Sequence, residues 1–287
     1  MRRWHSSRSR AWQVSEFFAT YGLLILALLT AGIFAGLIAG LFGIGGGVII
    51  VPTLDFAFTQ LGYESVSMHA AVGCSLATIV ATSIRSAMAH ARRGAVDFDV
   101  VKGWVPWIMV GAVIGAAIAG FLPKDGMRGF FASVLLLVSL QFVLGRPDWK
   151  LRDSLPTGLP RVGLAGGLGA LSGIMGIGGG VFGVTLMTVC GHTVHRAVGT
   201  AATFGAAIGL PAAIGYIATG WGMPDRPPIS LGYLNIPAIL IIALMTTSLA
   251  PFGAILAHRM NAALLRRVFG VVMILVALNM LRLALGF

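Results

Sequence analysis

Two glycine runs are the residues best suited to bind a ligand through their backbone. Gly43-Ile-Gly-Gly-Gly47 and Gly176-Ile-Gly-Gly-Gly180 each interrupt a long apolar stretch, although glycine lowers helix stability by roughly 1 kcal/mol per residue. A short helix that begins after such a break presents unpaired N–H groups and the positive end of its dipole, which favour an anion. Helix packing is the alternative, but packing needs glycine at every fourth residue. The glycines assigned to an anion site are Gly43, Gly45, Gly46, Gly47, Gly176, Gly178, Gly179 and Gly180.

Hydroxyl groups and one arginine could complete this site. Four hydroxyls fall in the first turns of two predicted helices and can share one face toward the breaks, although such groups also bond to their own helix carbonyls. Arg85 lies near the end of an apolar span, where a charge costs roughly 2.5–3.5 kcal/mol. It could attract the anion or extend to the cytoplasmic interface. The hydroxyl residues are Ser75, Thr78, Thr200 and Thr203.

Three further residues are candidates for proton coupling. Asp55 lies in the short helix after the first break, where it could carry a proton or form a structural pair. His69 and His195 begin matching helices, and imidazole titrates near neutral pH. A plain helix-entry role at the membrane surface is the alternative for both histidines.

The sequence contains no pattern typical of an enzyme or a metal site. It has no Ser/His/Asp order with supporting context, no paired carboxylates within a span and no His/Cys cluster at metal-ligand spacing. Cys74 and Cys190 lie in or beside apolar spans without ligand-spaced partners. We therefore expect no catalytic residues, no metal, no cofactor and no disulfide framework.

The elements that must position these residues are membrane helices. The 287 residues are 57% hydrophobic and 10% charged, against about 25% charged in a soluble domain, and the apolar runs repeatedly exceed the ~20 residues that cross a bilayer. The cations behind the net charge of +11 lie in short connections, which is typical of topology signals and argues against a nucleic-acid partner. The predicted fold is an all-α polytopic membrane protein with about eight spans: 21–42, 68–90, 104–122, 129–145, 162–175, 194–219, 231–257 and 264–285. Shorter helices at 48–61 and 181–190 follow the two breaks.

Two topologies remain open. With eight spans, the positive-inside rule places both termini and the cationic linker in the cytoplasm. If the glycine breaks are instead re-entrant hairpins, each half crosses an odd number of times and the two halves are inverted. Neither arrangement changes the residues assigned to the site.

Landmarks recur in order along the chain, which predicts two homologous halves. The glycine runs differ by 176 − 43 = 133 residues, while His69-Ala-Ala-Val-Gly73 and His195-Arg-Ala-Val-Gly199 differ by 195 − 69 = 126. Arg128 pairs with Arg266 at 266 − 128 = 138. We predict a cytoplasmic tail at 1–16, a first repeat at 17–145, a linker at 146–161 and a second repeat at 162–287.

These motifs resemble those of the TauE/SafE family, which is named for bacterial sulfite and sulfoacetate exporters. The resemblance covers most of the chain from Gly32 to Leu285 and includes the loop Gly94-Ala-Val-Asp97 and the segment Ala250-Pro-Phe-Gly253. It implies export of small anions, such as sulfite or organosulfonates, across a bacterial inner membrane. Cys74 departs from the threonine common at that position. Proton coupling and potential-driven exit both remain open, as do an anion channel, an importer and a sensing component. A homodimer is compatible with the Gly/Ala ridges.

Overall fold

The protein folds into a bundle of helices. A computed structural model describes residues 22, 26, 28–41, 45–144, 151–257 and 262–286, so the predicted tail and Gly43 lie outside the described residues. In the part of the chain described, the sole sheet is one antiparallel hairpin of β1 (Ser230–Leu231) and β2 (Leu234–Asn235). A helix at Leu28–Leu41 precedes α2 (Gly47–Gln60), η1 (Glu64–Val66), α3 (Ser67–Ala91), α4 (Phe98–Ala119), α5 (Lys124–Leu144), α6 (Gly158–Met175), α7 (Gly180–Val189), α8 (Val194–Thr219), α9 (Ile236–Ala257) and α10 (Ala262–Ala284).

The helices are long and apolar enough for a polytopic membrane protein. Among the described residues, six helices qualify as spans by length and composition: α3, α4 and α5, then α8, α9 and α10. Their outer faces carry exposed large apolar side chains, such as Val110 and Ile114 on α4 or Leu240 and Leu244 on α9. Such surfaces suit lipid rather than water. The all-α polytopic fold is therefore confirmed, while the count of eight spans is not.

Local capping explains where two helices depart from their predicted starts. α4 begins at Phe98 rather than Trp104, because the Asp97 carboxylate accepts hydrogen bonds from the N–H groups of Asp99 and Val100, both at 3.2 Å. α9 begins at Ile236 rather than at residue 231, because the residues before it form the β1–β2 hairpin. α6 begins at residue 158, inside the predicted linker, whereas α8 has its predicted bounds.

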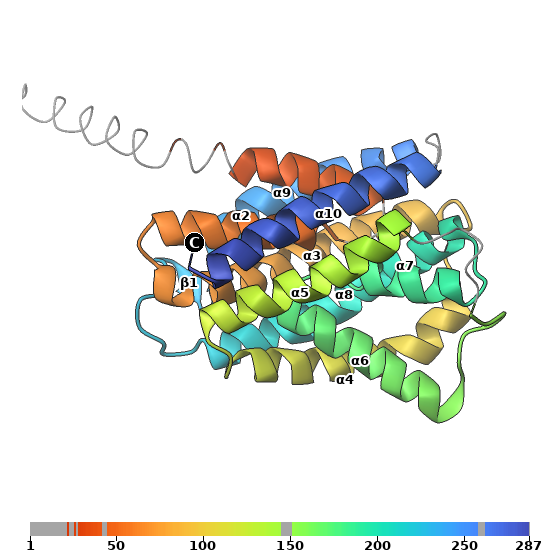
Figure 1. Ribbon diagram of the computed structural model, residues 1–287, viewed down its shortest axis with the longest axis horizontal. Helices are drawn as coiled ribbons and strands as arrows, with labels where there is room; N and C mark the ends of the chain where they lie inside the picture. Colours follow the sequence, from red (N-terminus) through yellow and green to blue (C-terminus); the bar gives the residue numbers. More distant parts are fainter. Residues whose placement is uncertain are drawn as a thin grey trace, which may run out of the picture.

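The matching helices α3 and α8 run in opposite directions. The end of α3 leads into Asp97, which forms an ion pair with Arg196 in the first turn of α8 at 3.1 Å. The start of α3 lies at the other end, where Cys74 contacts Asn235 beyond the end of α8. α3 and α8 are therefore antiparallel, and α2 and α7 lie toward opposite ends of the bundle (Figure 1).

The short helix α7 returns to the side of the bundle on which α6 begins. The N–H group of Leu151, which precedes α6, donates to the Val189 carbonyl at the end of α7 at 2.9 Å. α6 and α7 thus enter and leave on one side, with the glycine run at the turning point. This agrees with the re-entrant alternative, in which three helices of each half cross the membrane and the halves are inverted.

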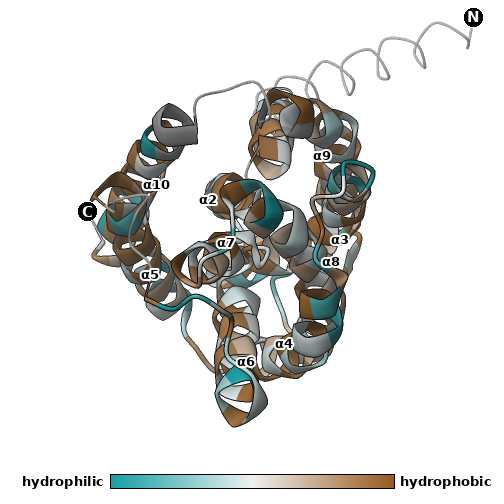
Figure 2. Ribbon diagram, turned by 90° about the vertical axis from the view of Figure 1, so that its right-hand side faces the viewer, coloured by the Kyte–Doolittle hydropathy of each residue, from teal (hydrophilic) through white to brown (hydrophobic). Residues whose placement is uncertain are grey.

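Corresponding helices also pack in corresponding ways. Gly115 of α4 packs against the Ala170 carbonyl of α6, and Gly253 of α9 packs against the Leu37 carbonyl of the first described helix. Each partner is displaced by the predicted offset, 253 − 115 = 138 and 170 − 37 = 133. The matched contacts support the predicted duplication, which stays a prediction. Seen end-on, α2 and α7 occupy the centre and the longer helices surround them (Figure 2).

Candidate functional site

The two glycine breaks meet at the centre of the bundle. A Cβ atom at Gly47, the first residue of α2, would collide with the Gly176 carbonyl oxygen and the Ile177 backbone. Gly46 and Gly176 have φ angles of 79° and 70°, a region that non-glycine residues rarely adopt. The prediction that the breaks lie close together is therefore confirmed. Gly47 thus touches Gly176 and Ile177, and we call the place where the runs 45–47 and 176–180 meet through this contact the glycine crossing.

Two helix N-termini face the glycine crossing. α2 begins at Gly47 with Gly46 as its N-cap, and α7 begins at Gly180 with Gly179 as its N-cap. No side chain caps either of these two helices. Because the first N–H groups of a helix lack partners within the helix, they and the two positive dipole ends are suited to an anion. The remaining assigned glycine, Gly178, is buried in the segment between them.

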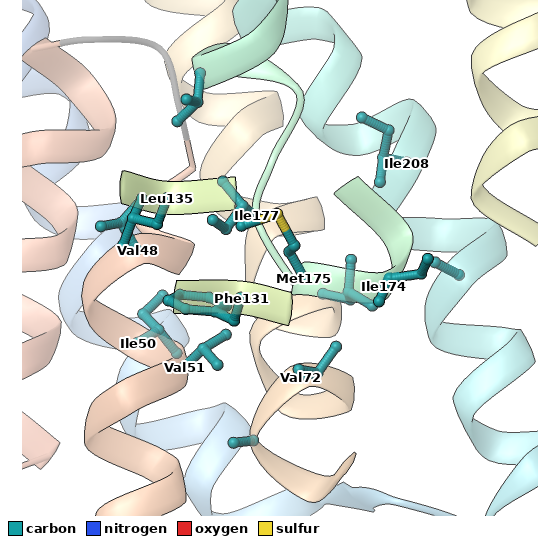
Figure 3. Close-up of a cluster of buried hydrophobic side chains, with 14 of the residues drawn as sticks. Val48, Ile50, Val51, Val72, Phe131, Leu135, Ile174, Met175, Ile177 and Ile208 are labelled. Carbon is teal, nitrogen blue, oxygen red and sulfur yellow. The ribbon is translucent and has the colours of Figure 1, made fainter. Parts of the chain in front are cut away.

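Apolar side chains close the glycine crossing in this conformation (Figure 3). Gly45 lies against Ile79, and Gly179 lies against Phe204 and Ile208. The surrounding cluster comes from α2, α3, α5, α6, α8 and the second glycine run, and its members are Val48, Ile50, Val51, Val72, Phe131, Leu135, Ile174, Met175, Ile177 and Ile208. Water is thus excluded from a place where backbone polar groups converge, which strengthens any electrostatic interaction there.

Three hydroxyls lie within about one helical turn of the glycine crossing. Ser75 donates a hydrogen bond to the Gly176 carbonyl at 2.7 Å. Thr78, three residues later on α3, and Ser172, four residues before Gly176 on α6, are fully buried, and neither hydroxyl has a hydrogen-bond partner among the described residues. An unsatisfied buried hydroxyl costs about 1–3 kcal/mol. Both hydroxyls are therefore candidates to bind a ligand at the glycine crossing.

The hydroxyls of Thr200 and Thr203 have structural partners instead. The Asp97 N–H group donates to Thr200 Oγ1 at 2.9 Å, and Thr203 Oγ1 donates to the Thr200 carbonyl at 2.7 Å. In the other half, the Asn235 N–H group donates to Cys74 Sγ at 3.1 Å. Positions 74 and 200 therefore make equivalent contacts. Each accepts a hydrogen bond from the residue just before a helix of the opposite half, Asn235 before α9 and Asp97 before α4.

Asp55 forms a buried ion pair. It lies on α2 and is fully buried, and Arg128 of α5 binds both its carboxylate oxygens, Nε to Oδ2 at 2.8 Å and Nη2 to Oδ1 at 3.0 Å. Ser67 adds a hydrogen bond to Oδ1 at 2.6 Å. Both oxygens of this carboxylate are thus held by charge-assisted hydrogen bonds. The contacts favour the structural alternative for Asp55, and its coupling role stays a prediction.

The two histidines occupy different environments. His69 is buried, with Nε2 3.2 Å from the Ala119 carbonyl oxygen and the ring stacked on Tyr233 at 5.0 Å. Burial raises the pKa of the Tyr233 phenol, an effect that Arg226 partly offsets, so the Tyr233 side chain is neutral at physiological pH. His195 is exposed at the start of α8. Both positions suit helix entry, and neither histidine lies at the glycine crossing.

Arg85 lies away from the glycine crossing. It is exposed and lines an open pocket of about 400 Å³ between α3 and α9, together with Ala81, Ile84, Thr247 and Ser248. The structure thus brings together the described glycines with Ser75 and Thr78, but not Arg85, Thr200 or Thr203. Arg85 could attract an anion on approach without holding it at the glycine crossing.

Sequence reasoning missed two features of this region. Ser172 was open to discovery, because it is a lone hydroxyl one turn before a glycine run in an otherwise Gly/Ala/Leu-rich helix. Arg128 was noticed only as a repeat landmark, and its pairing with Asp55 across 73 residues left no local signal. Among the described residues, no group of three or more His, Cys, Asp or Glu side chains could hold a metal ion.

Comparison with known proteins places this geometry in a family. The family profile described as "Sulfite exporter TauE/SafE" matches residues 28–280. A relative from Haemophilus influenzae, named a probable membrane transporter protein, is 35% identical over 260 residues, which cover 89% of this chain and 97% of the relative.

Two more distant relatives carry similar names. The probable membrane transporter protein YdhB of Bacillus subtilis is 30% identical, with 69% of this chain and 80% of the relative covered. A probable membrane transporter protein of Methanocaldococcus jannaschii is 26% identical, with 77% and 82% covered. No solved structure matches the chain. The profile match, which spans most of the sequence, shows that the chain belongs to the TauE/SafE family of membrane transporters.

Proposed function

We propose that this protein exports a small anion, such as sulfite or a C2 organosulfonate, from the cytoplasm across a bacterial inner membrane. The observation that carries the proposal is the glycine crossing, where Gly47 at the start of α2 meets Gly176 and Ile177, shortly before the uncapped start of α7. The unpartnered hydroxyls of Thr78 and Ser172 lie one helical turn along the chain from Ser75 and Gly176. Helix N-termini bind oxyanions through N–H groups and the dipole, without a fixed positive charge. Partial charges can hold an anion and also release it, which suits a transporter.

The closed glycine crossing supports alternating access over an open channel. The apolar cluster of Figure 3 fills the space around it, so an anion reaches it only after helices move. Inverted halves that meet near the midplane are suited to such movement, since each half can open toward one side. The membrane potential favours outward anion movement by ~2.3 kcal/mol per charge per 100 mV. Proton coupling is not required by this scheme.

Two substitutions test the anion site without disturbing the fold. Thr78→Val and Ser172→Ala each remove a hydroxyl that has no partner in the structure, so the melting temperature should stay the same or rise. Sulfite flux into proteoliposomes should fall about tenfold or more, because a hydrogen bond to a charged ligand contributes about 1.5–3 kcal/mol.

Thr219→Val is the matched control. Its hydroxyl bonds to the Gly215 carbonyl of its own helix at 3.0 Å, so flux should not change. Unaltered sulfite flux in both Thr78→Val and Ser172→Ala would refute the proposed site.

A further inference from the structure

One face of α3 carries a row of buried hydroxyls that extends beyond the glycine crossing. The residues are spaced by three, four, one and three positions, which keeps them on one side of a helix. Each is at most 2% exposed. We call them the α3 hydroxyl row: Ser75, Thr78, Thr82, Ser83 and Ser86.

Much of the α3 hydroxyl row lacks hydrogen-bond partners. Among the described residues, the hydroxyls of Thr78, Ser83 and Ser86 have none. Thr82 shares a hydrogen bond with Thr246 of α9 at 2.7 Å, and the absence of a Cβ at Gly205 of α8 leaves room beside the Ser83 hydroxyl. Because buried polar groups in proteins are nearly always satisfied, three neighbouring exceptions call for water or a ligand in another conformation.

The corresponding face of α8 is apolar. With the offset of 126 residues that relates Cys74 to Thr200, Thr78 matches Phe204, Thr82 matches Ile208 and Ser86 matches Ala212. All three α8 residues are buried. The matched contacts of Cys74 and Thr200 fix this register independently. Of these two matching helices, α3 alone carries a row of buried hydroxyls on this face in the part of the chain that the structure describes.

The α3 hydroxyl row connects the glycine crossing to one side of the membrane. Ser75 bonds to Gly176, and Ser86 lies eleven residues further along α3, about 16 Å away at the helical rise of 1.5 Å per residue. That distance is about half the thickness of the hydrocarbon core. Beyond the row, α3 ends at Ala91, and the exposed Arg92 and Arg93 that follow assign this end to the cytoplasmic side by the positive-inside rule.

We propose that the α3 hydroxyl row lines a hydrophilic half-pathway from the cytoplasm to the glycine crossing, through which a small oxyanion enters while the α8 side stays sealed. The proposal rests on the proposed function for the identity of the solute. Hydroxyls that donate to oxygen atoms can replace part of an anion's hydration shell along a path with no fixed charge. Rearrangement of the Thr82–Thr246 pair would open it.

Cysteine labelling tests the half-pathway. In a background with Cys74→Thr and Cys190→Ser, Ser86→Cys and Ser83→Cys are compared with Ala212→Cys, the matched buried position on α8. A membrane-impermeant sulfonated methanethiosulfonate is added to vesicles of known orientation during sulfite turnover. Both serine variants should react from the side of Arg92 and Arg93, because the reagent reaches them through the hydrated half-pathway. Their labelling rates should exceed that of Ala212→Cys at least about tenfold, which corresponds to about 1.4 kcal/mol in the free energy of access.

The outcomes separate this inference from the proposed function. Equal rates at Ser86→Cys and Ala212→Cys, labelling from the opposite side, or no labelling of either serine variant in folded protein would overturn the half-pathway. Labelling does not depend on which solute is carried. If the Ser86→Cys variant is labelled as expected but the background protein transports no sulfite, the half-pathway is supported and the proposed substrate is overturned.

Discussion

α3 and α8 occupy matching places in the two halves, yet they differ in what they present to the centre. Both begin with a histidine motif, and both anchor the N-cap of the fourth helix of the opposite half, through Cys74 with Asn235 and Thr200 with Asp97. Toward the centre, α3 presents hydroxyls where α8 presents apolar groups. The docking contacts are thus equivalent in the two halves while the lining is not.

This difference separates the structural use of a repeat from its functional use. Contacts between the predicted halves recur in both, through Cys74 with Asn235 and through Thr200 with Asp97. The proposed half-pathway, in contrast, needs polar groups only along the side from which the solute enters. The buried Asp55–Arg128 pair is likewise confined to the first half among the described residues, since the offset of 133 residues places Thr188 opposite Asp55.

The largest expected loss of stability follows from disrupting the Asp55–Arg128 ion pair. Asp55→Asn leaves Arg128 buried without its carboxylate and should destabilise the protein by about 3–5 kcal/mol, measured as a fall in thermal stability in detergent. Thr188→Val, at the matching place, should change stability little, because the Thr188 hydroxyl bonds only to carbonyls of its own helix, at 2.8 and 2.9 Å. Joint replacement of the pair, Asp55→Leu with Arg128→Met, should recover most of the loss. A mild effect of Asp55→Asn would contradict a structural role for the pair.

A smaller loss of stability is expected when the docking contacts of Thr200 and Cys74 are removed. Thr200→Val leaves the Asp97 N–H group without an acceptor and should cost about 1–3 kcal/mol of stability. Cys74→Val removes the equivalent contact to Asn235, but a thiol is a weaker acceptor, so the loss should be smaller, about 1 kcal/mol. Thermal unfolding of both variants measures the order. A larger loss for Cys74→Val would mean that the two contacts are not equivalent.

Much of the fold could be predicted from the sequence, because apolar length and glycine runs act locally. α8 has the predicted bounds Val194–Thr219, and the breaks that interrupt the apolar stretches do meet. The count of eight spans stays a prediction at the short helices, since hydrophobicity alone does not distinguish a span from a hairpin that returns. The bond from Leu151 to Val189, which shows the return of α7, joins residues 38 positions apart along the chain.

The candidate site was harder to predict, because its hydroxyl groups are recognised by their missing hydrogen-bond partners. Ser172 and Thr78 are candidates because their hydroxyls have no partner among the described residues, which no sequence pattern reports. The sequence predicts Thr200 as a ligand contact together with Ser75, because both lie near the start of their helices, but the Asp97 N–H group uses the Thr200 hydroxyl. Arg85 looked like an anion contact by charge, and packing places it in a pocket on another face of α3.

The most direct test of the central claim is to locate the anion itself. Selenite is a heavier analogue of sulfite, and selenium gives a strong anomalous X-ray signal in crystals soaked with it. The glycine crossing should show one selenium peak within hydrogen-bond distance of the N–H groups that begin α2 and α7, close to Thr78 and Ser172. A peak in the pocket beside Arg85, with nothing at the glycine crossing, would contradict an anion site built from backbone and hydroxyl groups.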